Sequence, residues 1–203
     1  MKIAVFDFCE TLVNVQSHDL FIKYYLKTKN KKIRLLAFLI LKSLFLRIIF
    51  KLAGKSPKKL ILSLIKNENE EDIKMISCKF STMLIDSLNP KVFEILKDRA
   101  NNEDFKCIII SAGLSINIRD FLKKANLKNV QVIANELCFI NKKFSGYYLR
   151  PDCYGPEKVN RYKKFYPSKN IDFFYTDCYS DKPLIDISLN SYLIKNNQNI
   201  IKI

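Results

Sequence analysis

Residues 2–12 read KIAVFDFCETL, and the prediction of the fold starts from them. It begins with a short apolar run that ends in an acid, a pattern that predicts a buried strand over 2–7 with Asp7 at its carboxyl end. In open α/β sheets the functional groups lie at the carboxyl ends of the strands. Asp7 is therefore the first candidate functional residue.

Strands and helices alternate in the second half of the sequence. Apolar runs and breaks predict strands over 105–111, 130–134 and 171–176 with a final strand over 191–194, and helices over 89–99, 115–125, 156–165 and 183–187. Residues 136–149 alternate around Gly146 as a hairpin does. This order predicts an α/β fold with a parallel sheet that helices cover on both faces. Residues 17–87 are helical in character and interrupt the pattern after the first strand.

Composition narrows the class of protein. The chain has 203 residues, 48% of them hydrophobic and 27% charged, which suits one domain with a modest insertion and argues against disorder. The single histidine, His18, excludes zinc sites with two or three histidine ligands. Six cysteines without a C-x-x-C pair argue against a zinc ribbon. The first residues do not resemble a secretory signal, so we expect reduced thiols and a cytoplasmic protein.

The net charge of +15 favours anionic partners: phosphate esters, nucleic acid or an anionic membrane surface. Most of the lysines are expected to form a solvated surface. No nucleic-acid partner is expected, because the basic residues are spread along the chain without a recognised motif. A small phosphorylated molecule is the expected substrate.

Residues 33–53 read IRLLAFLILKSLFLRIIFKLA, an apolar stretch that carries Arg34, Lys42, Arg47 and Lys51. Cations near its middle do not suit a membrane-spanning helix. Two interpretations stay open. The stretch lies in a membrane interface with its cations reaching outward, or it forms one or two buried helices of a small helical domain. We favour buried helices, and keep peripheral contact with an anionic membrane or a lipid phosphate as the alternative.

Four elements together suit a phosphate site. The first holds Asp7, Cys9 and Thr11; the second runs Ser111-Ala112-Gly113; the third carries Lys158; and the fourth carries Asp177 and Asp181. They supply a carboxylate nucleophile, a hydroxyl and backbone N–H groups for phosphate oxygens, a cation, and acids for a metal ion. Hard oxygen ligands favour Mg²⁺ over zinc.

In these elements the chain resembles the haloacid dehalogenase superfamily, and within it the phosphoserine-phosphatase-like subclass with a helical cap. The resemblance implies a Rossmann-like core formed by residues 1–12 and 88–203, with residues 13–87 as a cap that closes over the substrate. It makes Asp7 the nucleophile and lets Ser111 hold the transferring phosphoryl group beside Ala112 and Gly113. It makes Lys158 the neutralising cation. Thr11 belongs to the first motif as a substrate-binding residue. The magnesium ligands would come from Asp7, the backbone carbonyl of Cys9, Asp177 and Asp181.

Two positions depart from the pattern of the family. Cys9 stands where the family has an aspartate that acts as general acid and base. A thiol, with an ordinary pKa near ~8.5, can give a proton but is a poor base around neutrality. Gln16 stands where phosphoserine phosphatases have a glutamate that binds the substrate ammonium, which speaks against phosphoserine as the substrate.

These residues predict a Mg²⁺-dependent phosphatase that acts on a phosphate monoester through Asp7. Because of Cys9, two alternatives stay open: a phosphotransferase, or a catalytically impaired protein that binds phosphate. The segment 33–53 adds a lipid-linked phosphate as an alternative substrate.

Overall fold

The computed structural model describes residues 1–53, 56–195 and 199–203. Its centre is a six-stranded sheet in the order β3-β2-β1-β6-β7-β8. The strands are β1 (Lys2–Phe6), β2 (Phe105–Leu114), β3 (Val130–Asn135), β6 (Ile171–Thr176), β7 (Ser188–Lys195) and β8 (Asn199–Lys202). The first five strands run parallel, and β8 pairs antiparallel with β7. Asp7 therefore follows a central strand.

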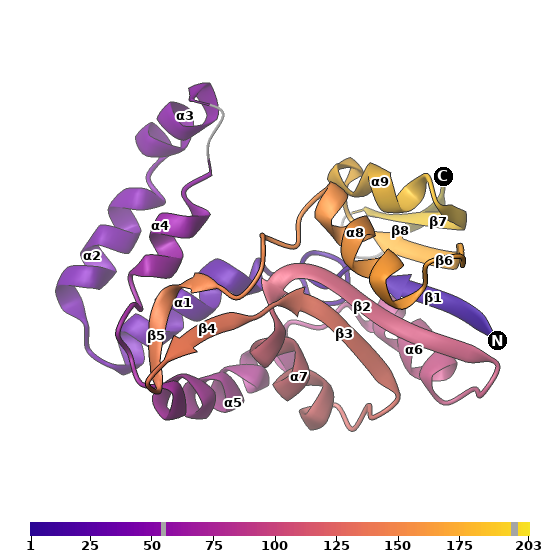
Figure 1. Ribbon diagram of the computed structural model, residues 1–203, viewed down its shortest axis with the longest axis horizontal. Coiled ribbons are helices and arrows are strands. Elements are labelled where there is room, and N and C mark those ends of the chain that lie inside the picture. The colour runs from indigo at the N-terminus through magenta and orange to yellow at the C-terminus, as the bar shows by residue number, and fades with distance from the viewer. Residues whose placement is uncertain (54–55, 196–198) are drawn as a thin grey trace.

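Helices cover both faces of this sheet (Figure 1). The helices α6 (Pro90–Ala100) and α7 (Ser115–Lys124) pack on one face, and α8 (Pro156–Phe165) and α9 (Lys182–Ile185) pack on the other, the latter just after a short 3₁₀ turn, Tyr179–Asp181. The side chains of β1 alternate between two apolar clusters: Ala4 and Phe6 belong to one, Ile3 and Val5 to the other. The α/β fold with a covered parallel sheet is confirmed.

Among the described residues, five helices lie between β1 and α6: α1 (Ser17–Thr28), α2 (Lys32–Leu41), α3 (Leu44–Leu52), α4 (Lys58–Ser63) and α5 (Glu70–Asp86). The helix α5 packs along α7, where Ser77 Oγ donates a hydrogen bond to Asp120 Oδ2 over 2.6 Å. The rings of Phe21 and Phe80 join α1 to α5. One apolar cluster continues from these helices to the sheet, which fixes α1 beside the end of β1.

The hairpin expected over residues 136–149 is present, but its turn is elsewhere. It pairs β4 (Leu137–Ile140) with β5 (Lys143–Tyr148), and the turn falls at Asn141 and Lys142, which both have positive φ. Gly146 lies within β5 instead, where the side chain of Lys66 approaches it closely. The sheet also continues beyond the strand expected to be final, because β8 follows β7.

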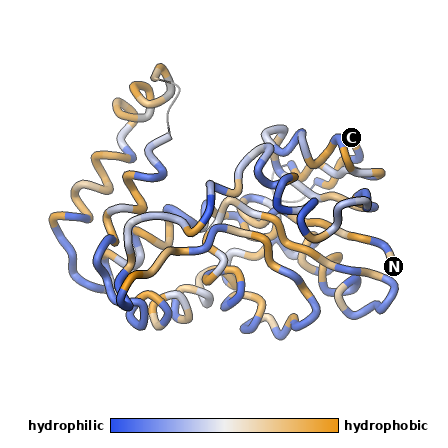
Figure 2. The backbone as a smooth tube through the Cα atoms, viewed as in Figure 1, coloured by the Kyte–Doolittle hydropathy of each residue, from blue (hydrophilic) through white to orange (hydrophobic). Residues whose placement is uncertain are grey.

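The expectation of buried helices over residues 33–53 is wrong. The helices α2 and α3 project from the rest of the molecule with α4 beside them (Figure 1). Phe38 is the one buried residue of α2, and most of the described apolar side chains of α3 are exposed. Figure 2 shows the hydrophobic colouring along this projection. No helix in the described part of the chain combines the length and hydropathy that crossing a membrane requires.

Candidate active site

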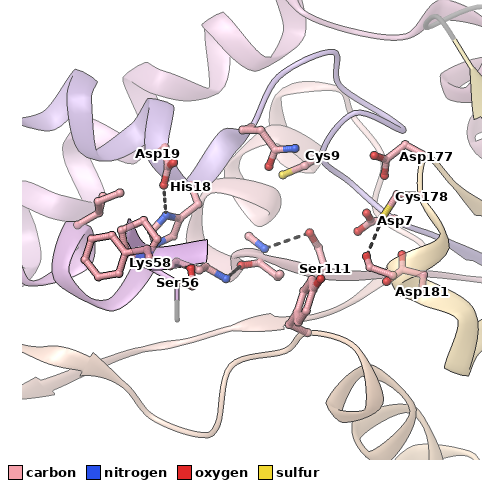
Figure 3. A pocket seen from close by; sticks show the side chains of 18 of the residues that line it. Asp7, Cys9, His18, Asp19, Ser56, Lys58, Ser111, Asp177, Cys178 and Asp181 are labelled. Carbon is pink, nitrogen blue, oxygen red and sulfur yellow. Dashed lines mark hydrogen bonds and ion pairs between the residues drawn. The ribbon is translucent and has the colours of Figure 1, made fainter. Parts of the chain in front are cut away.

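The candidate residues converge from four places in the sequence on one cavity of about 730 Å³ (Figure 3). Asp7 follows β1, Ser111 lies near the end of β2, and Lys158 is in the first turn of α8. Asp177 and Asp181 follow β6. This convergence arises because parallel strands end at the same edge of the sheet.

Asp7 lines this cavity and is almost fully buried. Its backbone N–H donates to the carbonyl of Tyr175 on the neighbouring strand, which fixes the position of the residue. Burial raises the pKa of Asp7 to about 6; Lys158 opposes this shift, and the carboxylates of Asp181 and Asp177 add to it. The carboxyl group is thus held close to other acids with one lysine beside it.

Lys158 joins Asp7 to Asp181. Its Nζ atom lies 3.1 Å from Asp7 Oδ1 and 2.7 Å from Asp181 Oδ1. Asp181 also accepts a hydrogen bond from Thr176 Oγ1 over 2.9 Å. Burial opposes the charge of Lys158, but the two carboxylates outweigh it and raise the pKa of the lysine. Lys158 is therefore a permanent cation that reaches the candidate nucleophile.

The helix that carries Lys158 begins at a backbone position that suits glycine. Gly155 has a φ of +54°, a backbone angle that residues other than glycine rarely adopt. Pro156 follows at the first helical position, where its missing N–H has no consequence. The sequence Gly155-Pro156 thereby fixes the start of α8 and directs Lys158 toward Asp7.

Thr11 does not line the cavity, which differs from the substrate-binding position expected from the sequence. Its side chain is fully buried, and its Oγ1 donates to Asp177 Oδ1 over 3.3 Å. The chain turns sharply to bring it there, with Glu10 at a φ of +56°. Thr11 therefore orients Asp177.

Ser111, Ala112 and Gly113 all line the cavity, as expected. The backbone N–H of Gly113 donates to Ser111 Oγ over 3.1 Å. A Cβ atom at Gly113 would lie 3.1 Å from Ser17 Oγ and 3.4 Å from Ser111 Oγ. The residue is thus a glycine because β2 meets the start of α1 at this point.

Cys9 and Gln16, the two departures from the family pattern, also line the cavity. The Sγ atom of Cys9 lies 3.1 Å from Ser17 Oγ. Burial raises the pKa of the Cys9 thiol to about 11, and the nearby Asp7 adds to the shift. Gln16 immediately precedes α1, so its neutral amide stands at the entrance of the helical block.

Two further groups at the cavity were missed from the sequence. The Nζ atom of Lys58, on α4, donates to the carbonyl of Ala112 over 2.8 Å and to Asp152 over 2.8 and 2.9 Å. Asn135, at the end of β3, also donates to the Ala112 carbonyl over 2.9 Å. In a lysine-rich helix, no sequence signal separates Lys58 from its neighbour Lys59.

The second missed group surrounds His18. Its Nδ1 atom lies 2.8 Å from Asp19 Oδ1, and its Nε2 atom lies 2.9 Å from the hydroxyl of Tyr148 on β5. Burial lowers the pKa of His18. Asp19 also pairs with Lys42 at the end of α2. These contacts connect α1, α2 and β5 at the outer part of the cavity.

The donor set suits a small divalent cation. Asp7, Asp177 and Asp181 bring three carboxylates around one lysine, and Asp7 Oδ1 is buried without a well-aligned hydrogen bond from any described residue. Within the described ranges, no three histidine, cysteine or acidic side chains form a closed metal cluster. Mg²⁺ typically takes one or two protein carboxylates and keeps several waters, so Asp7 and Asp177 could supply its protein oxygens.

The fold and the cavity define an α/β protein with an aspartate, a serine and a lysine at the carboxyl edge of its sheet. The sequence model described as haloacid dehalogenase-like hydrolase matches residues 4–186. The chain belongs to this family, and the expected class of enzyme, a hydrolase of this superfamily, is confirmed.

Solved structures share the fold. A protein of unknown function from Bordetella pertussis Tohama I has a TM-score of 0.74 at 15% identity, over 91% of this chain and 86% of its own. A phosphoserine phosphohydrolase-like protein from Francisella tularensis has a TM-score of 0.67 at 20% identity, and the match covers 98% of this chain and 89% of that protein. A structure of phosphoserine phosphatase, solved as an analogue of its phospho-aspartyl intermediate, has a TM-score of 0.53 at 18% identity. The match covers 94% of this chain and 84% of that protein. A search of the curated proteins by sequence finds no match.

Proposed function

We propose that this protein is a Mg²⁺-dependent phosphatase that hydrolyses a phosphate monoester through Asp7. The observation that carries the proposal is the position of Lys158 Nζ, 3.1 Å from Asp7 Oδ1 at the cavity that Ser111 also lines. A lysine held there can neutralise a phosphoryl group as it approaches the carboxylate. The family of the chain and its likeness to phosphoserine phosphatases support this chemistry.

The reaction has two steps. A carboxylate oxygen of Asp7 attacks phosphorus, the bond from phosphorus to the ester oxygen breaks, and the leaving alcohol takes up a proton. Water then attacks the aspartyl phosphate, releases inorganic phosphate and restores Asp7. Ser111 and the backbone N–H groups that follow it supply hydrogen bonds to the phosphoryl oxygens.

A magnesium ion would be held by Asp7, Asp177 and the backbone carbonyl of Cys9. When bound, it offsets the negative charge of the carboxylates and the phosphate. Asp181 has a different part, because its Oδ2 accepts hydrogen bonds from both Lys158 and Thr176, and its Oδ1 forms an ion pair with the same Lys158 Nζ over 2.7 Å. Thr11 orients Asp177 through its hydroxyl. Asp181 therefore positions Lys158.

Cys9 limits the second step. Its thiol can give a proton to the leaving group but is a poor base toward water, so hydrolysis of the phosphoenzyme is expected to be slow. General acid–base catalysis typically contributes ~10²–10⁴ in rate. This favours a second candidate function, a phosphotransferase that passes the phosphoryl group to an acceptor alcohol. If neither hydrolysis nor transfer occurs, the protein would instead be the catalytically impaired alternative, which binds phosphate without turnover.

The test is Mg²⁺-dependent release of phosphate from a panel of phosphate monoesters by the wild type and by Asp7→Asn. The proposal expects turnover in the wild type and none in Asp7→Asn. Full phosphate release by Asp7→Asn would contradict it. Added glycerol separates the two candidates, because a phosphotransferase forms more glycerol phosphate than the ratio of glycerol to water predicts.

A further inference from the structure

The helices α2 and α3 present an apolar surface that the described chain leaves uncovered. We call residues 32–52 the apolar arm. Ile33 is 86% exposed and Leu52 is 83% exposed, values that rule out a buried role for either end of the arm. The other exposed apolar residues of the arm are Leu36, Leu39, Ile40, Leu44, Phe45, Ile48 and Ile49. An uncovered patch of this kind marks an interaction surface.

The exposed residues of each helix share one side. In α3 they recur as Leu44, Ile48 and Leu52, with Phe45 and Ile49 beside them, which is a stripe along a single helix face. In α2 they are Ile33, Leu36, Leu39 and Ile40. Figure 2 shows both helices as hydrophobic on the part of the molecule that stands away from the sheet. The arm therefore offers two neighbouring apolar stripes.

The charged residues of the arm and its flanks in the sequence have one sign, although Lys31 and Arg34 pair with Glu68 in the fold and Lys42 pairs with Asp19. Residues 20–67 contain thirteen lysine and arginine residues and no aspartate or glutamate. Lys32 at the start of the arm and Lys59 on α4 are both exposed. A symmetric contact between two copies would bring these cations together. An anionic bilayer instead attracts basic residues and accepts the apolar stripes below its headgroups.

The arm is continuous with the active-site cavity. Leu44, Ile48 and Phe50 of α3 line the same cavity as Asp7 and Ser111. Leu44 and Ile48 are also exposed members of the stripe, so an apolar path leads from the outer face of the arm toward the catalytic groups. A substrate that reaches Asp7 along this path would have a phosphate at one end and an apolar body.

We propose that the apolar arm docks on the surface of an anionic lipid bilayer and that the active site takes a phosphate monoester carried by a lipid of that bilayer. The second part rests on the function proposed above, whereas the first does not. Docking places the cavity lining of α3 at the membrane, where the acyl part of the substrate stays in contact with apolar side chains while its phosphate reaches Asp7.

Docking is tested without any substrate, by co-sedimentation with two kinds of vesicle. One kind is phosphatidylcholine alone, and the other contains ~30% phosphatidylglycerol, which gives the vesicle a negative surface potential. The wild type should bind the anionic vesicles at least about tenfold more strongly than vesicles of phosphatidylcholine alone. Phe45→Asp combined with Leu52→Asp should weaken that binding about 100-fold or more, because two exposed side chains outside the cavity lose their contact with lipid.

The matched control is Leu189→Asp, at a 65% exposed leucine of β7 that lies outside the arm. It should bind vesicles as the wild type does. Equal binding by the arm variant and the wild type would overturn the proposal. So would a wild-type dimer that fails to bind vesicles and becomes a monomer in the arm variant, because the arm would then cover a second copy.

The absence of tryptophan from the sequence allows a second measurement. In Phe45→Trp the new indole is the protein's single tryptophan, and its emission should shift to the blue when anionic vesicles are added. In Leu189→Trp the emission should stay unchanged. An unshifted spectrum of Phe45→Trp in the presence of vesicles would contradict insertion of the arm.

The substrate is tested with phosphatidic acid in the same vesicles, and with p-nitrophenyl phosphate as a soluble ester. We expect the arm variant to lose hydrolysis of phosphatidic acid about tenfold or more while it keeps hydrolysis of the soluble ester. Activity on the soluble ester without any on the vesicles would overturn the substrate class alone. Inactivity on both, with vesicle binding intact, would instead contradict the proposed phosphatase function.

Discussion

The Sγ atom of Cys9 lies 3.1 Å from the Oγ atom of Ser17, the first residue of α1. Cys9 and Asp7 line the same cavity, and the carboxylate of Asp7 adds to the raised pKa of the thiol. The thiol therefore lies where a side chain could pass a proton to a substrate bound at Asp7. A different side chain at position 9 could form a hydrogen bond with the hydroxyl of Ser17. The Cys9 thiol is itself a poor proton acceptor at neutral pH, because burial raises its pKa to about 11 and keeps it protonated.

Replacing Cys9 by aspartate should place a better proton acceptor at this position. We expect Cys9→Asp to raise the rate of phosphate release by ~10²–10⁴, the usual contribution of general acid–base catalysis. Cys9→Ser is the matched control, because its hydroxyl fits the same contact with Ser17 but is a poor base at neutral pH. Steady-state phosphate release from a soluble monoester measures the effect. Similar rates in both variants would show that hydrolysis is not limited by this position.

Magnesium should stabilise the folded protein through Asp177. A ligand at ~100 times its dissociation constant adds about 2.7 kcal/mol to the free energy of unfolding. We expect thermal unfolding of the wild type to shift upward when EDTA is replaced by excess MgCl₂, and Asp177→Asn to lose most of that shift.

The control for this measurement is Asp186→Asn, at an exposed aspartate paired with Lys182 on the surface. It should keep the magnesium shift of the wild type. An equal shift in Asp177→Asn would remove this residue from the metal site, whatever the activity of the variant.

The convergence of Asp7, Ser111 and Asp177 on one cavity could be predicted from the sequence because these residues lie at or near the ends of strands. Asp7, Ser111 and Asp177 each come at or near the end of an apolar run, and the ends of parallel strands share one edge. The order of the elements also predicted the covered sheet. Each of these residues is recognised from its immediate neighbours in the sequence. The parallel sheet then brings the strand ends, and with them these residues, to one edge.

Other parts depend on contacts that a sequence pattern does not contain. Lys58 reaches Asp152 across 94 positions of the chain, and nothing at either position indicates the other. The helical periodicity of residues 33–53 indicates an apolar face but not whether another element covers it. The alternation around Gly146 predicts a hairpin centred there, yet Asn141 and Lys142 adopt the positive φ that the turn requires.

Stability in acid should depend on Asp19. Burial would raise the pKa of this carboxyl, but hydrogen bonds from His18 and Lys42 outweigh it and lower the pKa to about 2. Because the folded value lies below the ordinary 3.8, the stabilisation is present above pH ~4 and is lost as the pH falls through ~2. Its size is at most about 2 kcal/mol, since Lys42 is partly exposed to solvent.

Urea unfolding of the wild type and of Asp19→Asn between pH 2 and 6 measures this contribution. The difference between their free energies of unfolding should be largest near the upper end of this range and approach zero near its lower end. Asp98→Asn, at an exposed aspartate of α6, should show little difference from the wild type at any pH. A constant difference for Asp19→Asn across the range would contradict the assignment.

Lys58 should contribute to catalysis by holding α4 against the end of β2. Its Nζ atom contacts the carbonyl of Ala112, the residue after Ser111, and pairs with Asp152. Hydrogen bonds to charged groups contribute about 1.5–3 kcal/mol, so Lys58→Met should lower kcat/KM for a soluble phosphate monoester by ~10–100-fold. Lys59→Met removes an exposed lysine from the next position of the same helix and should leave kcat/KM within about twofold of the wild type. Lys58→Arg keeps the charge and should recover part of the loss. If Lys58→Met and Lys59→Met have the same kcat/KM, the contact between α4 and Ala112 has no part in turnover.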